Sequence, residues 1–195
     1  MKIIFATNNK NKVEEINHLS HQKFQIFTLQ EVGIDIDIPE PHDTLEANAT
    51  EKSSTIYKLT NEAVFSEDTG LEVEALGGAP GVKSARYAGE GRNMQDNIDK
   101  LLAALKDKPS RAARFRTVVS LIIGGKEYQF EGICKGQITT TQDGTKGFGY
   151  DPIFIPDGSN TTFANMDISE KNTFSHRKKA VQQLIHFLND YQASI

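Results

Sequence analysis

The chain has 195 residues, of which 22 are basic and 26 acidic, so its formal net charge is −4; 37% of the residues are hydrophobic and 25% charged. This composition is ordinary for a globular protein, and the length of residues 1–195 suits one large domain or two closely packed lobes. A negative charge balance argues against a protein that holds nucleic acid mainly by neutralising phosphates. It leaves room for a small phosphorylated ligand.

The sequence indicates a cytoplasmic protein. Its single cysteine, Cys134, cannot form an internal disulfide, and its strand-like neighbourhood Phe130–Lys135 favours a buried, structural side chain. The apolar stretch Ile3–Ala6 is too short for a signal peptide, and no segment approaches the ~20 apolar residues that span a bilayer.

Hydrophobic periodicity predicts alternating strands and helices in the first third of the chain. In order, these are a strand at Lys2–Ala6, a helix carrying Val13, Ile16 and Leu19, a strand at Phe24–Leu29, a helix at Thr44–Leu59 and a brief strand at Ala63–Ser66. Asp43 or Thr44 can serve as N-cap of the second helix, which carries near one face Leu45, Ala49, Lys52, Ile56 and Leu59. The residues Glu67-Asp68-Thr69-Gly70 then predict an acidic turn.

The rest of the chain predicts a long hairpin framed by helices. After a breaker-rich loop at Leu76–Gly81, the expected elements are a helix from Met94 to Leu105, two strands at Arg114–Ile123 and Glu127–Lys135 joined by Gly124-Gly125, and a last helix carrying Ala180 to Leu188. Helices alternating with strands, followed by a hairpin, predict an α/β fold with a mixed sheet.

The loop after the first strand is a candidate phosphate site. It comprises Thr7, Asn8, Asn9, Lys10, Asn11 and Lys12. A loop between a strand and a helix presents backbone N–H groups at the positive end of the helix dipole, to which these side chains add donors and charge. Lys12 is a stronger candidate than Lys10, and the loop is not a Walker A motif. The same pattern is also typical of an N-capped helix with solvated lysines.

Acidic residues suggest a site for a hard cation. Asp68 follows a strand, where open α/β sheets tend to place chemistry, and Glu40 in the preceding Pro-flanked loop is a candidate second carboxylate. Such a pair suits Mg²⁺ shared with substrate phosphates, and Asp68 is also suited to orient or deprotonate an attacking water. The alternative is that the acids only decorate a turn.

Aromatic and basic residues near the end of the chain suit a nucleobase. The segment Phe148-Gly149-Tyr150-Asp151 offers two rings, and stacking on either one contributes on the order of 1–3 kcal/mol. His176 and Arg177, at the start of the last helix, offer donors that match the O6 and N7 acceptors of a 6-oxopurine, and Lys171 lies nearby in sequence. The alternatives are a tight turn with one ring in the core, and an ordinary basic helix start.

Taken together, these segments resemble the inosine-triphosphate/XTP pyrophosphatase family from Ile3 to about Leu188. The motifs stand in the family's order: FATNNKNKVEEI, EDTGLEVEALGGAPGVKSARYAGE, GFGYDPIF and SHRKKA. The resemblance implies a two-lobed, mixed-sheet inosine-triphosphatase-like fold with a central active-site cleft, usually as a homodimer. It also implies Mg²⁺-dependent hydrolysis of ITP, dITP and XTP to the monophosphate and pyrophosphate, which keeps these nucleotides out of DNA and RNA.

The resemblance assigns roles by position. Asp68 matches the proton acceptor and metal ligand, and Glu40 matches a second metal ligand. The implied substrate-binding residues are Thr7 to Lys12, Lys52, Thr69, Phe148 to Asp151, Lys171, His176 and Arg177. Asn8 stands where glycine is common, Thr69 replaces serine, and Lys83 stands where an aromatic residue is often found. Glu67 replaces a more usual aspartate, which we expect to shift a metal distance by about one methylene.

Three other functions fit less well. A septum-inhibitor-type pyrophosphatase shares the architecture but prefers pyrimidine triphosphates, which the motifs SHR and GFGYDP argue against. A catalytically silent purine-nucleotide sensor would not need the acidic residues. An RNA-binding module would need a basic stripe, and the sequence has none.

Overall fold

The computed structural model describes residues 1–17 and 24–193, so the predicted helix position Leu19 lies outside the described residues. The chain forms two compact units. Unit 1 comprises Met1–Asp68, Thr117–Gly132 and Arg177–Ile195, and unit 2 comprises Thr69–Arg116 and Ile133–His176. The chain therefore passes from one unit to the other at four points, between Asp68 and Thr69, Arg116 and Thr117, Gly132 and Ile133, and His176 and Arg177.

One mixed sheet contains all the strands of the described chain. Its strands are β1 (Lys2–Phe5), β2 (Gln25–Thr28), β3 (Val64–Val73), β4 (Pro80–Gly81), β5 (Ala112–Ile123), β6 (Lys126–Ile138) and β7 (Phe154–Pro156). Their order is β2-β1-β3-β5-β6-β7, with β4 paired to β3. β1 runs parallel to β2 and β3, whereas the pairs β3–β4 and β6–β7 are antiparallel. The predicted α/β fold with a mixed sheet is confirmed.

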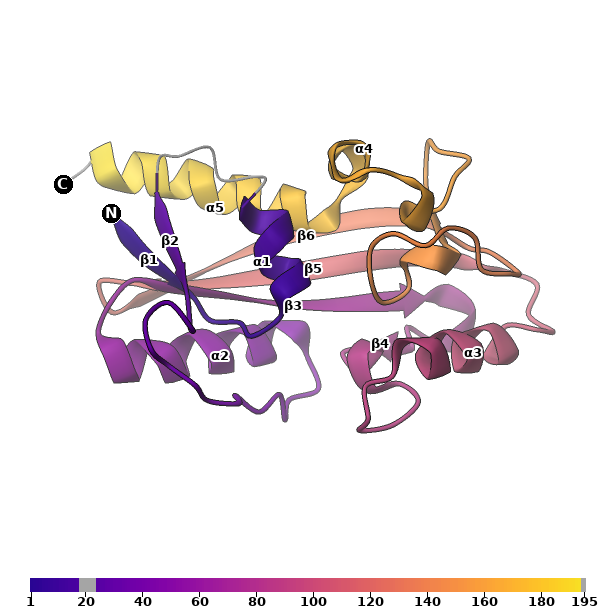
Figure 1. The fold of residues 1–195 in the computed structure, drawn as a ribbon, viewed down its shortest axis with the longest axis horizontal. Helices are drawn as coiled ribbons and strands as arrows, with labels where there is room; N and C mark the ends of the chain where they lie inside the picture. The colour runs from indigo at the N-terminus through magenta and orange to yellow at the C-terminus, as the bar shows by residue number, and fades with distance from the viewer. Residues whose placement is uncertain (18–23, 194–195) are drawn as a thin grey trace. The chain divides into compact units, whose positions relative to one another are not determined.

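Unit 1 holds three helices around its part of the sheet: α1 (Lys10–Asn17), α2 (Leu45–Thr60) and most of α5 (His176–Ala193). Within this unit, α2 and α5 lie on opposite faces of the strands (Figure 1). Because side chains alternate along a strand, Ile3 and Phe5 of β1 pack with Leu184 of α5, whereas Ile4 packs with Ile56 of α2. The unit therefore has one apolar cluster on each face of its sheet.

Unit 2 has a single large apolar cluster. The helix α3 (Met94–Ala104) contributes Ile98 and Leu101, which pack with Leu71 of β3 and Phe154 of β7. The short helix α4 (Ile168–Phe174) and four 3₁₀ helices complete the described elements, at Glu74–Leu76, Ser84–Arg86, Asp151–Ile153 and Phe163–Asn165. No helix in the described part of the chain is long and apolar enough to span a membrane.

Local signals set several element boundaries as predicted. Thr44 caps α2, because its side chain accepts a hydrogen bond from the backbone N–H of Ala47 at 3.2 Å. Gly124 and Gly125 both have positive φ, 57° and 74°, as a tight two-residue turn between β5 and β6 requires. Cys134 is buried in β6, at 3% exposure.

The predicted acidic turn at Glu67–Gly70 is wrong, because β3 continues through these residues to Val73. Their turn propensity is overruled by tertiary partners: basic side chains from α1, α2 and α5 neutralise both acids in place. Two smaller differences follow from packing. Pro80 and Gly81, predicted as loop, pair with β3. Leu59, expected near the same face of α2 as the buried Leu45 and Ile56, lies in the last turn of the helix and is 63% exposed.

Candidate active site

The predicted phosphate loop joins β1 to α1 and forms a capped helix start. The Asn9 carboxamide oxygen accepts from the backbone N–H groups of Asn11 and Lys12, at 3.0 and 3.3 Å, and the Asn9 N–H donates to the Thr7 hydroxyl at 3.2 Å. In the structure the Asn9 side chain satisfies these two backbone N–H groups at the start of α1. The loop therefore forms an N-capped helix start, which is the alternative to a phosphate site that the sequence had left open. The exposed Asn8 donates from Nδ2 to the Ile36 carbonyl at 2.9 Å.

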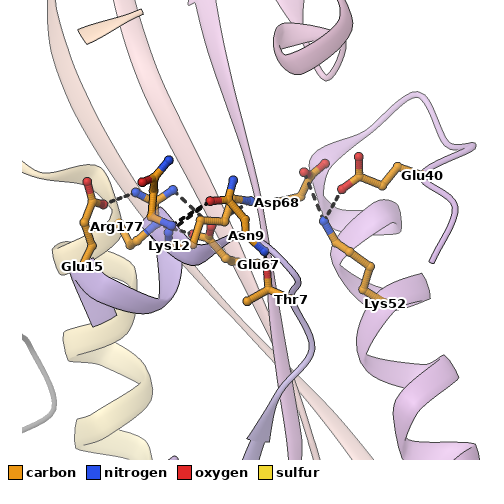
Figure 2. Close-up of polar contacts among 10 residues, drawn as sticks. Thr7, Asn9, Lys12, Glu15, Glu40, Lys52, Glu67, Asp68 and Arg177 are labelled. Atoms are coloured by element: carbon orange, nitrogen blue, oxygen red, sulfur yellow. Dashed lines mark hydrogen bonds and ion pairs between the residues drawn. The ribbon is translucent and has the colours of Figure 1, made fainter. Parts of the chain in front are cut away.

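Lys12 belongs to a buried charge network with Arg177. The Lys12 ammonium lies 2.9 Å from Oε1 of Glu67, whose side chain is fully buried. The guanidinium of Arg177 donates to both oxygens of Glu67, at 2.8 and 3.1 Å, and to Oε2 of Glu15 (Figure 2). A guanidinium has five N–H donors, of which these two carboxylates accept three. We did not predict Glu15 from the sequence, although its place between the apolar Val13 and Ile16 marks a half-buried helix face.

Charge pairing keeps this network ionised. Burial alone would raise the pKa of Glu67, but Arg177 and Lys12 outweigh burial and hold that pKa well below its usual range. Burial alone would lower the pKa of Arg177, but Glu67 and Glu15 outweigh it and raise the pKa. The four groups therefore form a compact cluster of two acids and two bases.

Lys52 joins the two predicted metal ligands. Its ammonium lies 2.5 Å from Oε1 of Glu40 and 3.3 Å from Oδ1 of Asp68 (Figure 2). The other oxygen of Asp68, Oδ2, is buried and has no hydrogen-bond partner among the described residues. Burial raises the pKa of Asp68 despite the opposing charge of Lys52. Burial alone would lower the pKa of Lys52, but Asp68 and Glu40 outweigh it and raise that pKa.

This arrangement fits a divalent cation. Two carboxylates already surround one positive charge, and the buried Asp68 Oδ2 has a lone pair available for a ligand. No group of three or more His, Cys, Asp or Glu side chains that could hold a metal occurs in residues 1–17 and 24–193. Two protein carboxylates, completed by water and phosphate oxygens, are the usual ligand set for Mg²⁺, whereas structural zinc needs more protein ligands.

The acids Glu67 and Asp68 belong to different networks because they are neighbours in a strand. Successive side chains of β3 point to opposite faces of the sheet. Phe65 and Glu67 share the face of α1 and α5, whereas Ser66, whose hydroxyl donates to the Ala49 carbonyl of α2, shares the other face with Asp68. The methylene by which Glu67 exceeds an aspartate therefore extends toward Arg177 and Lys12, away from the Glu40–Asp68 pair.

The predicted base segment lies in unit 2 and is held by Asp151. Oδ2 of Asp151 accepts from the backbone N–H of Phe148 at 2.9 Å and from the Lys171 ammonium at 2.7 Å. That ammonium also lies 5.1 Å from the centroid of the Phe148 ring. Gly147 has φ 75°, and a Cβ there would meet the Asp151 carboxylate at 2.1 Å, so this turn requires glycine.

The two rings of this segment have different environments. Tyr150 is 4% exposed, packs in the unit 2 core and donates its hydroxyl to the Ser84 carbonyl at 2.8 Å. Burial raises the pKa of that hydroxyl. Phe148 is half-buried, so it is the ring that remains for stacking. The backbone N–H of the intervening Gly149 points to the Met94 sulfur at 3.1 Å, a contact that we did not predict.

The remaining candidates, Thr69 and His176, each lie beside a point where the chain changes unit. Thr69 follows Asp68 in β3 and is half-buried. His176, the first residue of α5, is 3% exposed, and its imidazole stacks on Phe115 with centroids 4.7 Å apart. Unit 1 thus contains the phosphate and metal candidates together with Arg177, and unit 2 contains Phe148, Asp151, Lys171 and His176. From the sequence we predicted Phe115 only as a strand residue, because the alternation of apolar residues indicates a buried ring but not which ring it contacts.

A family model described as the Ham1 family matches residues 3–187. The chain belongs to the Ham1 family. Among its relatives in this family, a dITP/XTP pyrophosphatase from Flavobacterium johnsoniae is 50% identical over 188 residues, which cover 96% of this chain and 98% of that protein. A dITP/XTP pyrophosphatase from Porphyromonas gingivalis is also 50% identical, with 96% and 97% coverage.

Solved structures agree with the family assignment. The structure of the Staphylococcus aureus Ham1 protein matches with a TM-score of 0.89 at 36% identity and covers 98% of this chain and 100% of that chain. A HAM1 protein from Coxiella burnetii matches with a TM-score of 0.89 at 34% identity, with 97% and 99% coverage. The inosine-triphosphatase-like fold that the motifs imply is therefore confirmed.

Proposed function

We propose that this chain hydrolyses dITP, ITP and XTP to the nucleoside monophosphate and pyrophosphate. Half of its residues are identical to those of proteins named dITP/XTP pyrophosphatase, over nearly the whole length of each chain. The observation that carries the proposal is the Glu40–Lys52–Asp68 cluster. Its two carboxylates share the Lys52 ammonium, and one buried oxygen of Asp68 has no hydrogen-bond partner within the described part of the chain. Such a cluster suits metal-assisted phosphoanhydride hydrolysis.

Glu40 and Asp68 are the residues that we propose to hold Mg²⁺. When bound there, the ion would neutralise phosphate charge and favour departure of the pyrophosphate. Lys52, whose ammonium contacts the same two acids in the structure, holds them close together and is the group that we propose for contact with a phosphate oxygen.

Asp68 is the proposed proton acceptor. A water oxygen forms a bond to the α-phosphorus while the bond from that phosphorus to the α–β bridging oxygen breaks. The water proton passes to Asp68, and the bridging oxygen leaves with the bonding electrons on pyrophosphate. Burial raises the pKa of Asp68, which favours proton uptake by its carboxylate.

The loop Thr7–Lys12 is the proposed binding site for the polyphosphate. Lys12 supplies positive charge that Glu67 keeps in place at 2.9 Å, and the Thr7 hydroxyl adds a donor. Asn9 acts through the helix cap, which sets the direction of the first turn of α1. Asn8, Lys10 and Asn11 complete the proposed loop.

Base recognition is the proposed task of the unit 2 candidates and Arg177. Phe148 supplies a stacking face, Asp151 and Lys171 a charged pair beside it, and His176 a donor to a 6-oxopurine. Adenine carries an amino donor where these purines carry a carbonyl, so it would leave donors unpaired at about 1–3 kcal/mol per group. Arg177 is 2% exposed and already donates to Glu15 and Glu67, so its guanidinium would have to become more accessible to contact a base as well.

Three further properties belong to the same proposal. The protein would act in the cytoplasm, where removing non-standard purine nucleotides protects DNA and RNA, and it would form a homodimer. Its two units would behave as one domain with the active site in a cleft. Light scattering after size exclusion tests the dimer, and a single unfolding transition seen by two probes tests the single domain.

The testing experiment measures pyrophosphate release from ITP, dITP, XTP, GTP, ATP and dTTP with and without Mg²⁺. We expect release from the first three to depend on Mg²⁺ and to exceed release from the others by at least ~100-fold. Preference for dTTP would replace the proposal with a pyrimidine-directed pyrophosphatase. Binding of ITP without turnover would identify a sensor.

A further inference from the structure

Phe115 and His176 form a ring pair that the proposed function does not use. Phe115 lies in β5 at 7% exposure, and His176 begins α5 at 3% exposure. Their ring centroids are 4.7 Å apart and their planes differ by only 14°. One face of the imidazole is therefore covered by a parallel aromatic ring.

Other rings of the unit 2 core hold Phe115 in turn. Phe154 meets Phe115 edge-on, with centroids 4.7 Å apart and planes at 63°. Phe163 stacks more loosely on Phe115 at 6.1 Å and 24°, and its own ring lies 5.3 Å from the Lys171 ammonium. Phe154 and Phe163 are both fully buried, so the orientation of the Phe115 ring is fixed by close packing.

We propose that Phe115 is a positioning residue for base recognition, which acts by fixing the plane of the His176 imidazole. The inference rests on the proposed function, in which His176 donates to the 6-oxo group of the purine. The ring torsion of histidine is soft, whereas a hydrogen bond weakens steeply as its angle departs from linear. A stacked ring limits that torsion, so the N–H direction is set before a nucleotide binds.

The test compares Phe115→Leu with the matched control Phe154→Leu. Both variants remove one buried ring from the same cluster, but only Phe115 stacks on His176. The measured quantity is the ratio of kcat/KM for ITP to kcat/KM for ATP. We expect Phe115→Leu to lower this ratio roughly three- to tenfold, mainly through KM for ITP, because that is the range of one lost aromatic pair. Phe154→Leu removes only a ring that supports Phe115 edge-on, so it should lower the ratio less than Phe115→Leu does.

A double variant tests whether Phe115 acts through His176. Residues that act through one interaction give non-additive effects. In a His176→Gln background, Phe115→Leu should therefore change the ratio by less than about twofold. Loss of the stacked ring should also move the His176 ring-proton resonances in the NMR spectrum, which are identified by their absence in His176→Gln. If Phe115→Leu does not fold, Phe115→Met fills a similar volume without a ring.

Each outcome separates this inference from the proposed function. A wild-type ratio near one contradicts the proposed function itself. A high wild-type ratio that His176→Gln leaves unchanged contradicts the role of His176, and with it the inference. If His176→Gln lowers the ratio but Phe115→Leu does not, or if Phe154→Leu lowers it equally, Phe115 is only a core residue and the inference is overturned.

Discussion

Replacing Glu67 with glutamine tests whether the buried charge network stabilises the fold. Glu67 is fully buried and accepts from Arg177 at 2.8 and 3.1 Å while it pairs with Lys12 at 2.9 Å. Glutamine keeps the shape but replaces one carboxylate oxygen with an NH₂ group, which faces donors rather than acceptors. Arg177, 2% exposed, would lose this charged partner while keeping its contact with Glu15.

The expected loss follows from this burial. Breaking a buried ion pair by removing one partner costs about 3–5 kcal/mol, because a desolvated charge is left without compensation. Domains of this size have a free energy of unfolding of about 5–15 kcal/mol, so the variant should fold but unfold at a much lower urea concentration. Urea unfolding followed by circular dichroism measures this difference, and an unchanged slope with denaturant shows that the unfolding reaction is the same.

The same strand offers a matched control. Glu72 of β3 accepts from Arg114 at 2.6 Å, but the two side chains are 22% and 45% exposed. A solvent-exposed pair contributes about 0–1 kcal/mol, so Glu72→Gln should change the free energy of unfolding by no more than that. If Glu67→Gln loses no more stability than Glu72→Gln, the desolvation cost of the buried network cancels its attraction and our reasoning is refuted.

Three further variants test other parts of the candidate site. Asp68→Asn should lower the rate of pyrophosphate release about 100- to 10,000-fold, because it removes the proposed proton acceptor. The loss of stability should be small, since burial already disfavours the charged form of Asp68. A rate within tenfold of wild type would contradict the proposed role of Asp68. Asn8→Gly removes the hydrogen bond to the carbonyl of Ile36, which lies four residues before Glu40. Because this is one exposed hydrogen bond, the Mg²⁺ concentration for half-maximal activity should rise roughly two- to fivefold. An unchanged Mg²⁺ titration would argue that the bond does not position Glu40. For Glu127, burial would raise the pKa, but hydrogen bonds from Thr50 and Ser120 outweigh it and lower the pKa below its ordinary 4.5. The Glu127 carboxylate therefore contributes fully to stability above pH 4.5, and this contribution is lost as the pH falls through the pKa of the folded state. In urea titrations, Glu127→Gln should destabilise the protein more at about pH 7 than at about pH 3.5. A difference that does not depend on pH would contradict this.

The parts of the fold that sequence predicted are those set by local chemistry. Apolar periodicity located β1, α2, α3 and the β5–β6 hairpin, because each buries one continuous face. The hydroxyl of Thr44 and the paired glycines at 124 and 125 fixed a helix start and a turn for reasons contained in a few residues. Such signals do not depend on the rest of the chain.

The contacts within the candidate site depend on partners far apart in sequence, so the pattern alone did not supply them. Glu67 pairs with a residue 110 positions away, and no local feature identifies Arg177 as its partner. The sequence likewise left open which of the rings of Phe148 and Tyr150 enters the core, since both flank a glycine. Packing against Ser84 decides this in favour of Tyr150.

Because a turn was wrongly predicted at Glu67–Gly70, the different roles of the two acids Glu67 and Asp68 could not be inferred from the sequence. In a turn, Glu67 and Asp68 would face one site together, and two adjacent carboxylates would repel each other unless a cation joined them. In a strand they point to opposite faces, so each acid makes its closest contacts with a different set of bases. Glu67 then neutralises Arg177 and Lys12 on the side of α1 and α5, while Asp68 faces Lys52 and Glu40 on the side of α2. Because Glu67 is fully engaged with two bases, Asp68 is the member of the pair with an oxygen left for a cation or a proton. Strand alternation therefore assigns the structural role to the first acid and the proposed chemical role to the second.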